Sequence, residues 1–180
     1  VIHSLHPLVT NAGIDMCEER GDAFFVMDLN EVNASVNTAV SKVAGLDTNY
    51  AAVYYPWVKV LDTAKNKPVL VPPSVIVPGA IAASDRIGAE WFAPAGLNRG
   101  ILGNVIEAKI RLNQADRDVL YDEKINPIAT FPQTGVCIWG QKTLQERSTA
   151  LDRINVRRLL ITLKKFIASS SRFLVFEQNT

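Results

Sequence analysis

A short, almost uninterrupted apolar run places the strongest constraint on the fold. The segment DAFFVMDL, residues 22–29, is typical of a strand that is buried on both faces of a sheet. It is followed by apolar residues at helical spacing that end at Gly45, and Asn30 is the candidate N-cap of that helix. A buried strand followed by an amphipathic helix favours a sheet that is flanked by helices.

The same alternation continues along the chain. Residues 50–62 are rich in aromatic and β-branched residues and predict one strand with a bulge or edge at Pro56. A hairpin turn and a short return strand follow. We expect further elements in this order: a helix over 77–91 with Pro78 in its first turn, a helix over 114–124, two short strands within 128–144, a helix over 149–171 capped by Thr149, and a final strand over 172–178.

These elements predict an α/β (α+β) fold with a mixed β-sheet flanked by helices. The 180 residues, 48% of them hydrophobic, suit a single domain over 1–180. The formal net charge of +1 gives no general basic field for nucleic acid. Apolar runs are shorter than a membrane span needs, and Cys17 and Cys137 are expected to be free buried thiols. Because the chain starts at Val1 and ends at Thr180, we interpret it as a fragment of a longer polypeptide.

The stretch WFAPAGLNRGIL, residues 91–102, is the best candidate for ligand chemistry. A loop over Gly96–Gly100 with Arg99 as its cation could hold a small phosphorylated ligand, but it lacks the spacing of phosphate-binding motifs and follows a helix. The other interpretation is a tight turn, set by Pro94, Gly96 and Gly100, in which Arg99 caps carbonyls or pairs with an acid. In that turn we expect Trp91 and Phe92 to pack inward.

We predict no catalytic set, no metal site and no cofactor. His3 and His6 precede several acids but lack a zinc-binding spacing, and Pro7 argues against a helix there. Cys137 has bulky neighbours, which favour an inert thiol. The carboxylates of residues 116–123 alternate with cations, which suits a solvated face or an intersubunit charge surface.

The helix over 149–171 carries five cations on the side opposite its apolar stripe. The sequence leaves three interpretations open: a solvated surface, a docking surface for an acidic partner, or a nucleic-acid contact, which the neutral total charge weakens. The five cations are Arg153, Arg157, Arg158, Lys164 and Lys165.

Several stretches together resemble the tail sheath protein of contractile-tailed bacteriophages, which is related to pyocin and type VI secretion sheaths. They occur in the family's order between Tyr50 and Asn179, whereas residues 1–49 match more loosely. The stretches are YAAVYYPWVKVLD, FAPAGLNRG, LNQADRDVLYDEKINPIATFP, VCIWGQKTL, LDRINVRRLLITLKKFI and SSRFLVFEQN.

The resemblance implies a structural subunit without enzymatic activity. Such subunits stack as hexameric rings around a tail tube, and contraction drives the tube through the host envelope for genome ejection. The implied partners are the subunit itself, the tail tube protein, and baseplate and tail terminator proteins, without direct nucleic-acid contact or membrane insertion. The implied location is the virion tail, after assembly in the bacterial host cytoplasm.

The resemblance also bears on single residues. The long helix faces the tube in the family, so we hypothesise that Arg153, Arg157, Arg158, Lys164 and Lys165 include tube-facing cations. The turn residues Pro94, Gly96, Arg99 and Gly100 are structural or intersubunit. The family's N- and C-terminal arms, which add strands to neighbouring subunits, lie outside this core, so we expect the fragment alone to be monomeric. The alternative is an α/β enzyme or binding module that uses the Gly96–Gly100 loop.

Overall fold

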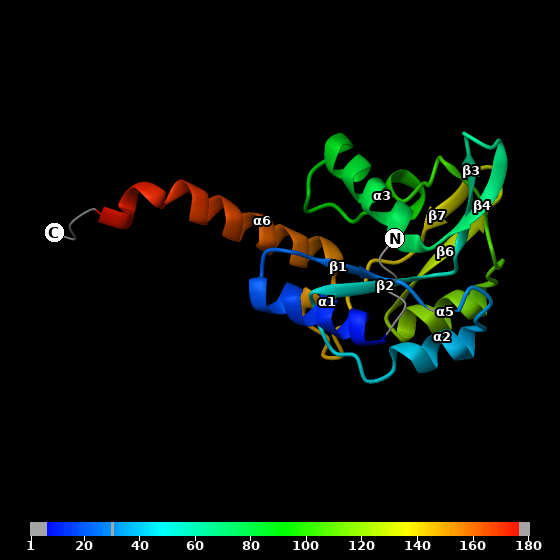
Figure 1. Ribbon diagram of the computed structural model, residues 1–180, viewed down its shortest axis with the longest axis horizontal. Coiled ribbons are helices and arrows are strands. Elements are labelled where there is room, and N and C mark those ends of the chain that lie inside the picture. The colour runs from blue at the N-terminus through cyan, green and yellow to red at the C-terminus, as the bar shows by residue number, and fades with distance from the viewer. Residues whose placement is uncertain (1–6, 30, 177–180) are drawn as a thin grey trace.

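A four-stranded mixed sheet forms the centre of the protein (Figure 1). The computed structural model describes residues 7–29 and 31–176. Strands β1, β2 and β6 run parallel, and β7 pairs antiparallel with β6 in the order β1-β2-β6-β7. Their bounds are Phe25–Met27, Ala51–Tyr55, Ile125–Phe131 and Gly135–Ile138.

A second, three-stranded antiparallel sheet has the order β4-β3-β5. Its strands are β3 (Val58–Asp62), β4 (Lys67–Val71) and β5 (Val105–Ala108). The single strand that we predicted over 50–62 is therefore two strands in two sheets. The break falls at Pro56, which follows a cis peptide bond and cannot donate a ladder hydrogen bond.

Helices cover both faces of the central sheet, as the buried run predicted. Successive residues of β2 are buried on opposite faces: Val53 and Tyr55 pack in one apolar cluster, and Ala52 and Tyr54 pack in another. Helices α1 (Pro7–Arg20), α2 (Val36–Val43) and α5 (Gln114–Asp122) supply side chains to the first cluster, and α3 (Pro73–Ile87) supplies them to the second.

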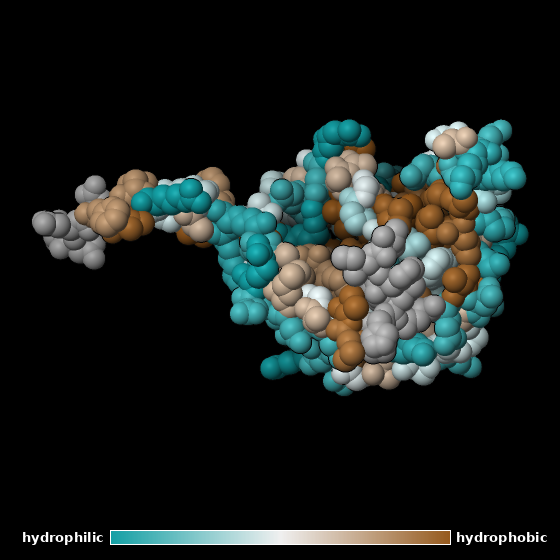
Figure 2. All heavy atoms as spheres, in the orientation of Figure 1, coloured by the Kyte–Doolittle hydropathy of each residue, from teal (hydrophilic) through white to brown (hydrophobic). Residues whose placement is uncertain are grey.

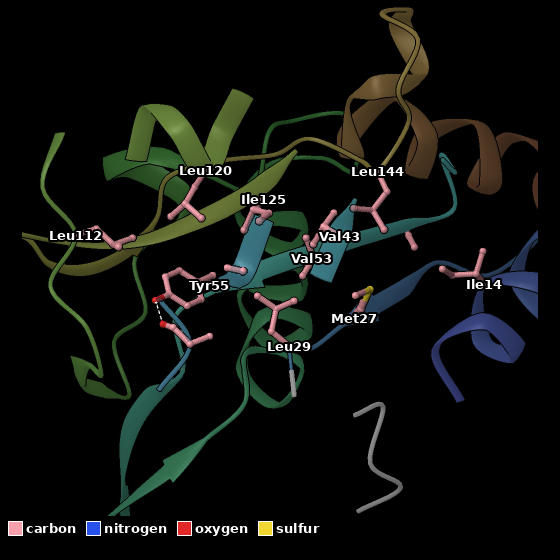
Figure 3. Packing of buried hydrophobic residues seen from close by; sticks show 13 residues of the cluster. Ile14, Met27, Leu29, Val43, Val53, Tyr55, Leu112, Leu120, Ile125 and Leu144 are labelled. Carbon is pink, nitrogen blue, oxygen red and sulfur yellow. Dashed lines mark hydrogen bonds between the residues drawn. The ribbon is translucent and has the colours of Figure 1, made fainter. Parts of the chain in front are cut away.

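The first cluster shows how the helices and the sheet interlock (Figure 3). Leu120 of α5 and Val43 of α2 meet Ile125 and Val53 of the sheet, and all four side chains are buried. Tyr55 crosses the cluster, and its hydroxyl donates a hydrogen bond of 2.5 Å to the carbonyl oxygen of Ala34. The single polar group of this buried tyrosine is thereby satisfied.

Helix boundaries differ from the prediction where proline or capping chemistry was misjudged. Helix α1 starts at Pro7, because the first position of a helix needs no N–H donor. Helix α2 is capped by Ser35, whose hydroxyl accepts a hydrogen bond from the Thr38 N–H at 3.2 Å, while the predicted cap Asn30 lies outside the described residues. Helix α3 starts at Pro73, so Pro78 lies inside the helix and not in its first turn.

The last described part of the chain, residues 150–176, is mostly helical. Helix α6 (Ile154–Ser170) confirms the predicted long helix, although Thr149 caps the 3-10 turn Ala150–Asp152 that precedes it. The strand predicted over 172–178 is wrong for its described part, because Arg172–Phe176 forms a 3-10 helix, η2. No described helix has the length and hydropathy that a membrane crossing requires.

Candidate functional site

Helix α6 leaves the body of the protein and projects from it (Figure 1). Its inner part packs on the body through Ile154, Arg157 and Ile161, all buried. From residue 162 to the end of η2, every described residue except Ser171 is exposed. The helix therefore consists of an inner part, residues 154–161, and an outer part, residues 162–170, which continues into η2.

The segment that leads into α6 is fixed to the central sheet by a buried amide. The Asn126 side chain on β6 donates to the carbonyl oxygens of Val53, at 3.0 Å, and Lys142, at 2.8 Å, and accepts from the Lys142 N–H at 2.6 Å. Lys142 in turn forms an antiparallel bridge with Arg153, next to the first residue of α6. Gly140 lies against this amide, and a Cβ at that position would lie 2.8 Å from Asn126 Oδ1.

Arg157 fixes the inner part of α6 to the loop before β2. Its side chain is 5% exposed, and its guanidinium lies 4.1 Å from the ring centroid of Tyr50. Nη1 donates to the Tyr50 hydroxyl at 3.1 Å, and Nη2 donates to Asn49 Oδ1. Asn49 Nδ2 donates in turn to Gln145 Oε1 at 2.9 Å, and Gln145 Nε2 donates to Thr149 Oγ1. This polar network joins the helix to two loops.

Two further cations of the predicted set, Arg153 just before α6 and Arg158 within it, are also bound within the chain. Arg158 forms a bidentate pair with Asp85 of α3, with Nη1 and Oδ1 3.0 Å apart. Arg153 donates to the Tyr121 hydroxyl at 2.5 Å, and its Nε lies 3.1 Å from Asp152 Oδ1. The structure thus gives Arg153, Arg157 and Arg158 intramolecular partners.

Lys164 and Lys165 are the exposed cations of the predicted set. Lys164 Nζ lies 3.5 Å from the Tyr50 hydroxyl. The pKa of the exposed Asp22 carboxyl is lowered, first by a hydrogen bond from Arg20 and to a smaller degree by the charge of Lys165. Both lysines remain accessible to a partner molecule.

The apolar stripe of α6 faces away from the body. Four of its side chains, here called the outer stripe, lie roughly 100° or more around the helix axis from Ile161, at 3.6 residues per turn. Phe166 and Ile167 are 64% and 62% exposed, and η2 adds four further exposed apolar side chains. Figure 2 shows apolar atoms along this projecting part. The outer stripe consists of Leu160 near the end of the inner part and of Leu163, Phe166 and Ile167 in the outer part.

The basic side of the helix is therefore the side that packs against the body. Sequence periodicity identified both sides but not their directions, and a solvated surface was one interpretation of the cations. Aromatic and amide groups from distant loops, Tyr50 and Asn49, make burial of Arg157 possible. No local sequence signal marks those partners.

The candidate ligand loop is a packed turn. Gly96–Arg99 forms a single helical turn, α4, with Gly96 at a positive φ of 83°. A Cβ at Gly100 would lie 2.6 Å from the Ile138 carbonyl oxygen, so close approach to β7 requires this glycine. Arg99 lies over the ring of Phe92, 4.3 Å from its centroid. Of the residues predicted to pack inward, Trp91 is 57% exposed and Phe92 37%, because the turn holds them at the surface beside Arg99.

The other candidate groups do not form a reactive constellation. Cys17 and Cys137 are free and buried, and burial raises the pKa of the Cys137 thiol to about 11. Asp116 closes a capping box with Asn113 at the start of α5. Among residues 7–29 and 31–176, no three His, Cys, Asp or Glu side chains are grouped to hold a metal ion, and His3 and His6 lie outside this part.

The sequence of residues 2–144 matches the model of a family described as phage tail sheath protein central domain. The tail sheath protein of Vibrio phage KVP40 is 32% identical over 166 residues, which are 82% of this chain and 25% of that protein. The tail sheath protein of Enterobacteria phage T4 is 42% identical over 109 residues, 61% of this chain and 16% of that protein. The chain thus spans about a quarter or less of the length of these two relatives.

A solved structure shares the fold. The PVC sheath complex of an extracellular contractile injection system, in the contracted state, superposes with a TM-score of 0.73 and 31% identity. The match covers 86% of this chain and 42% of that one.

Proposed function

Because the chain belongs to the phage tail sheath family, we propose that it is part of a structural subunit that polymerises into a contractile tail sheath. Subunits would stack as hexameric rings around a tail tube, and their contraction would drive the tube through the host envelope for genome ejection. Its partners would be further copies of the subunit, the tail tube protein, and baseplate and tail terminator proteins. It would reside in the virion tail after assembly in the host cytoplasm.

The projecting helix is the structural observation that carries this proposal. A protein that acts as a monomer rarely exposes a large contiguous apolar patch, and patches of that kind mark interaction sites. Here the exposed patch stands on a helix whose base is locked to the body by Arg157 and Asn126. A rigid body with a fixed projecting contact surface suits repeated assembly.

A structural role also fits the candidate chemistry better than catalysis does. The alternative, an α/β enzyme or binding module that uses the Gly96–Gly100 loop for a small phosphorylated ligand, has less support. The close approach to Ile138 explains why position 100 is a glycine. The guanidinium of Arg99 already lies over the ring of Phe92. The thiol of Cys137 is protonated at neutral pH, since its pKa is raised to about 11, and is thus a poor nucleophile.

For the tube contact we narrow the five candidate cations to Lys164 and Lys165. Arg153, Arg157 and Arg158 have partners within the chain, so rotating them outward would break those hydrogen bonds. An exposed ion pair contributes about 0.2–1 kcal/mol. Two such pairs per subunit, repeated around a ring, would hold a sheath on its tube and still release it.

The experiment is charge reversal of both lysines in the sheath subunit. Lys164→Glu with Lys165→Glu should leave the subunit folded but prevent sheath from growing on purified tail tubes. Electron micrographs would then show bare tubes. Sheathed tubes of normal length would contradict the tube-facing role.

A matched control carries the same charge change elsewhere. Lys65→Glu with Lys67→Glu alters two exposed lysines near the β3–β4 turn. This variant should sheathe tubes normally. If wild-type subunits form no hollow tubular polymer of any kind, the sheath proposal itself is wrong.

A further inference from the structure

A tyrosine hydroxyl lies between two cations of α6. Arg157 Nη1 donates a hydrogen bond to the Tyr50 hydroxyl oxygen at 3.1 Å, and Lys164 Nζ lies 3.5 Å from the same oxygen. A hydroxyl group has one proton to donate and two lone pairs that accept. Because both cations are donors and approach the oxygen, the proton of Tyr50 is directed to a third group.

The side chains around this hydroxyl supply no acceptor for its proton. Within the described part of the chain, its hydrogen-bond partners are these two cations alone. The carboxylates of the adjoining segments are engaged elsewhere: Asp22 pairs with Arg20 at 2.9 Å, and Glu18 accepts from the Thr48 hydroxyl. The proton of Tyr50 is therefore available to a ligand that accepts a hydrogen bond.

The positive charge beside this hydroxyl is not balanced by an acid. Arg157 is 5% exposed, and its hydrogen bonds go to neutral groups, the Tyr50 hydroxyl and Asn49 Oδ1. Its Nε is buried and has no hydrogen-bond partner among the described residues. Among the same residues, neither Arg157 nor Lys164 forms an ion pair. Burying a cation is costly unless an opposite charge compensates it, so an anion at this hydroxyl would be stabilised.

The geometry favours a carboxylate over a phosphate group. The residue after α1 closes one side: a Cβ at Gly21 would lie 3.6 Å from Tyr50 Oη and 3.7 Å from Lys164 Nζ. Gly21 has a positive φ of 64°, which favours glycine, so no side chain enters from this direction. The accessible donors are the hydroxyl and the ammonium group, and a carboxylate has two oxygens that accept from them. A phosphate group has three strong acceptor oxygens and would leave one of them without a donor.

We propose that Tyr50 Oη and Lys164 Nζ together bind one carboxylate group, and that Arg157 orients the hydroxyl from its buried side. The assignment rests on the proposed function, in which Lys164 contacts the tail tube. The carboxylate is then the side chain of an Asp or Glu of the tube protein. The cation pattern of α6 does not reveal Tyr50, because this residue lies on the loop before β2.

The site distinguishes the two lysines of the tube contact. Lys165 lies about 100° around the helix from Lys164, at 3.6 residues per turn. Its charge acts on a carboxyl of its own chain, Asp22, whose pKa is lowered first by Arg20 and to a smaller degree by Lys165. Lys164 therefore makes the specific contact, and Lys165 contributes general positive charge.

The experiment is zero-length cross-linking of sheath that has grown on purified tail tubes. A carbodiimide joins an amine to a carboxylate only where the two groups are in contact. Mass spectrometry should find an amide bond between Lys164 and an Asp or Glu of the tube protein. The yield at Lys165 should be several-fold lower, and the exposed Lys65 near the β3–β4 turn should give no product with the tube. The absence of a tube product at Lys164, or a product only with its own polypeptide, would overturn the proposal.

Removing the hydroxyl tests the part that Tyr50 plays. Tyr50→Phe keeps the ring beside the guanidinium of Arg157 but removes the hydroxyl and its hydrogen bonds. It should lower the cross-linking yield at Lys164 about tenfold, the loss expected for one hydrogen bond to a charged group. The matched control is Asn49→Ala, which removes the other hydrogen bond of Arg157 and leaves the hydroxyl in place. Equal losses in both variants would show that Tyr50 only anchors α6 and would reject it as a carboxylate-binding residue.

The carboxylate site and the sheath function fail in different ways. If subunits form sheath on tubes but Tyr50→Phe cross-links as well as the wild type does, the carboxylate site is wrong and the sheath function stands. If wild-type subunits form no tubular polymer, the sheath function is wrong and the carboxylate site falls with it. Urea unfolding of each variant confirms that its fold is intact.

Discussion

The inner and outer parts of α6 have similar sequences but opposite environments. In the inner part, Ile154 and Ile161 are buried. In the outer part, Phe166 and Ile167 point into solvent. An amphipathic pattern thus shows that a helix has an apolar side without showing which molecule covers it. The inner contacts stabilise the fold, whereas the outer side chains contribute only when a further surface covers them.

Truncating a leucine in the core and one on the outer stripe gives the largest contrast. Leu120→Ala should reduce the free energy of unfolding by about 2–5 kcal/mol, because Leu120 is fully buried and its loss leaves a cavity. Leu163→Ala should change it by less than about 0.5 kcal/mol. Urea unfolding of the isolated chain measures both, and a large effect at Leu163 would show that the stripe is covered within the chain.

The next largest effect should come from Arg157, which holds the two parts of the helix in place. Arg157→Ala removes charged hydrogen bonds to Tyr50 and Asn49, each of about 1.5–3 kcal/mol when charged groups are involved. We expect a loss of about 2–3 kcal/mol in urea unfolding. Lys165→Ala is the matched control and should be neutral, and a neutral Arg157→Ala would contradict an anchoring role.

Raising the pH should lower the free energy of unfolding through the buried thiol of Cys137. Burial raises the pKa of Cys137 from 9.0 to about 11. The unfolded chain therefore loses this proton first, and stability falls as the pH rises from about 9 to about 11. At pH 10 the loss is about 1 kcal/mol.

The matched comparison is Cys137→Ala, which should lack this component of the decline. It retains the contributions of Tyr54 and Tyr55, whose burial also raises their pKa values. Urea unfolding at pH 8 and pH 10 checks this, and identical pH dependence in both proteins would show that Cys137 is not responsible.

The smallest effect concerns the ion pair of Arg158 with Asp85 of α3. Both side chains are partly exposed, at 17% and 24%. Asp85→Asn should therefore cost about 0.2–1 kcal/mol, and less in 1 M NaCl. Thermal unfolding at two salt concentrations measures it, and a salt-independent loss would point to packing instead of charge.

The elements that were predicted well have signals that lie close together in the sequence. The uninterrupted apolar run before Asn30, the hairpin turn before β4, and the pattern of the helix predicted over 114–124 are all local signals, and the structure contains β1, β4 and α5. The whole of α1 was missed, since no element was predicted over residues 7–20 and Pro7 was considered only as an argument against a helix at His3 and His6. The fixed φ and missing N–H of proline favour the first helical position.

Features that depend on distant residues could not be predicted. Arg157 is buried because Asn49 and Tyr50, more than a hundred residues earlier, meet it in the fold. Trp91 and Phe92 were expected to pack inward, yet both are exposed and Arg99 lies over the ring of Phe92 at the surface. Whether an aromatic or a cation is buried depends on which segments fold against it.

The amide of Asn126 has a mechanical consequence. It ties β2, β6 and the segment before α6 together, and the Lys142–Arg153 bridge continues that tie to the base of the helix. A force that acts sideways on the tip of α6 is therefore transmitted through these hydrogen bonds to the middle of the sheet. The base of the helix is fixed rigidly to the body. A rotation of the body therefore moves the tip of the helix through a longer arc than the base.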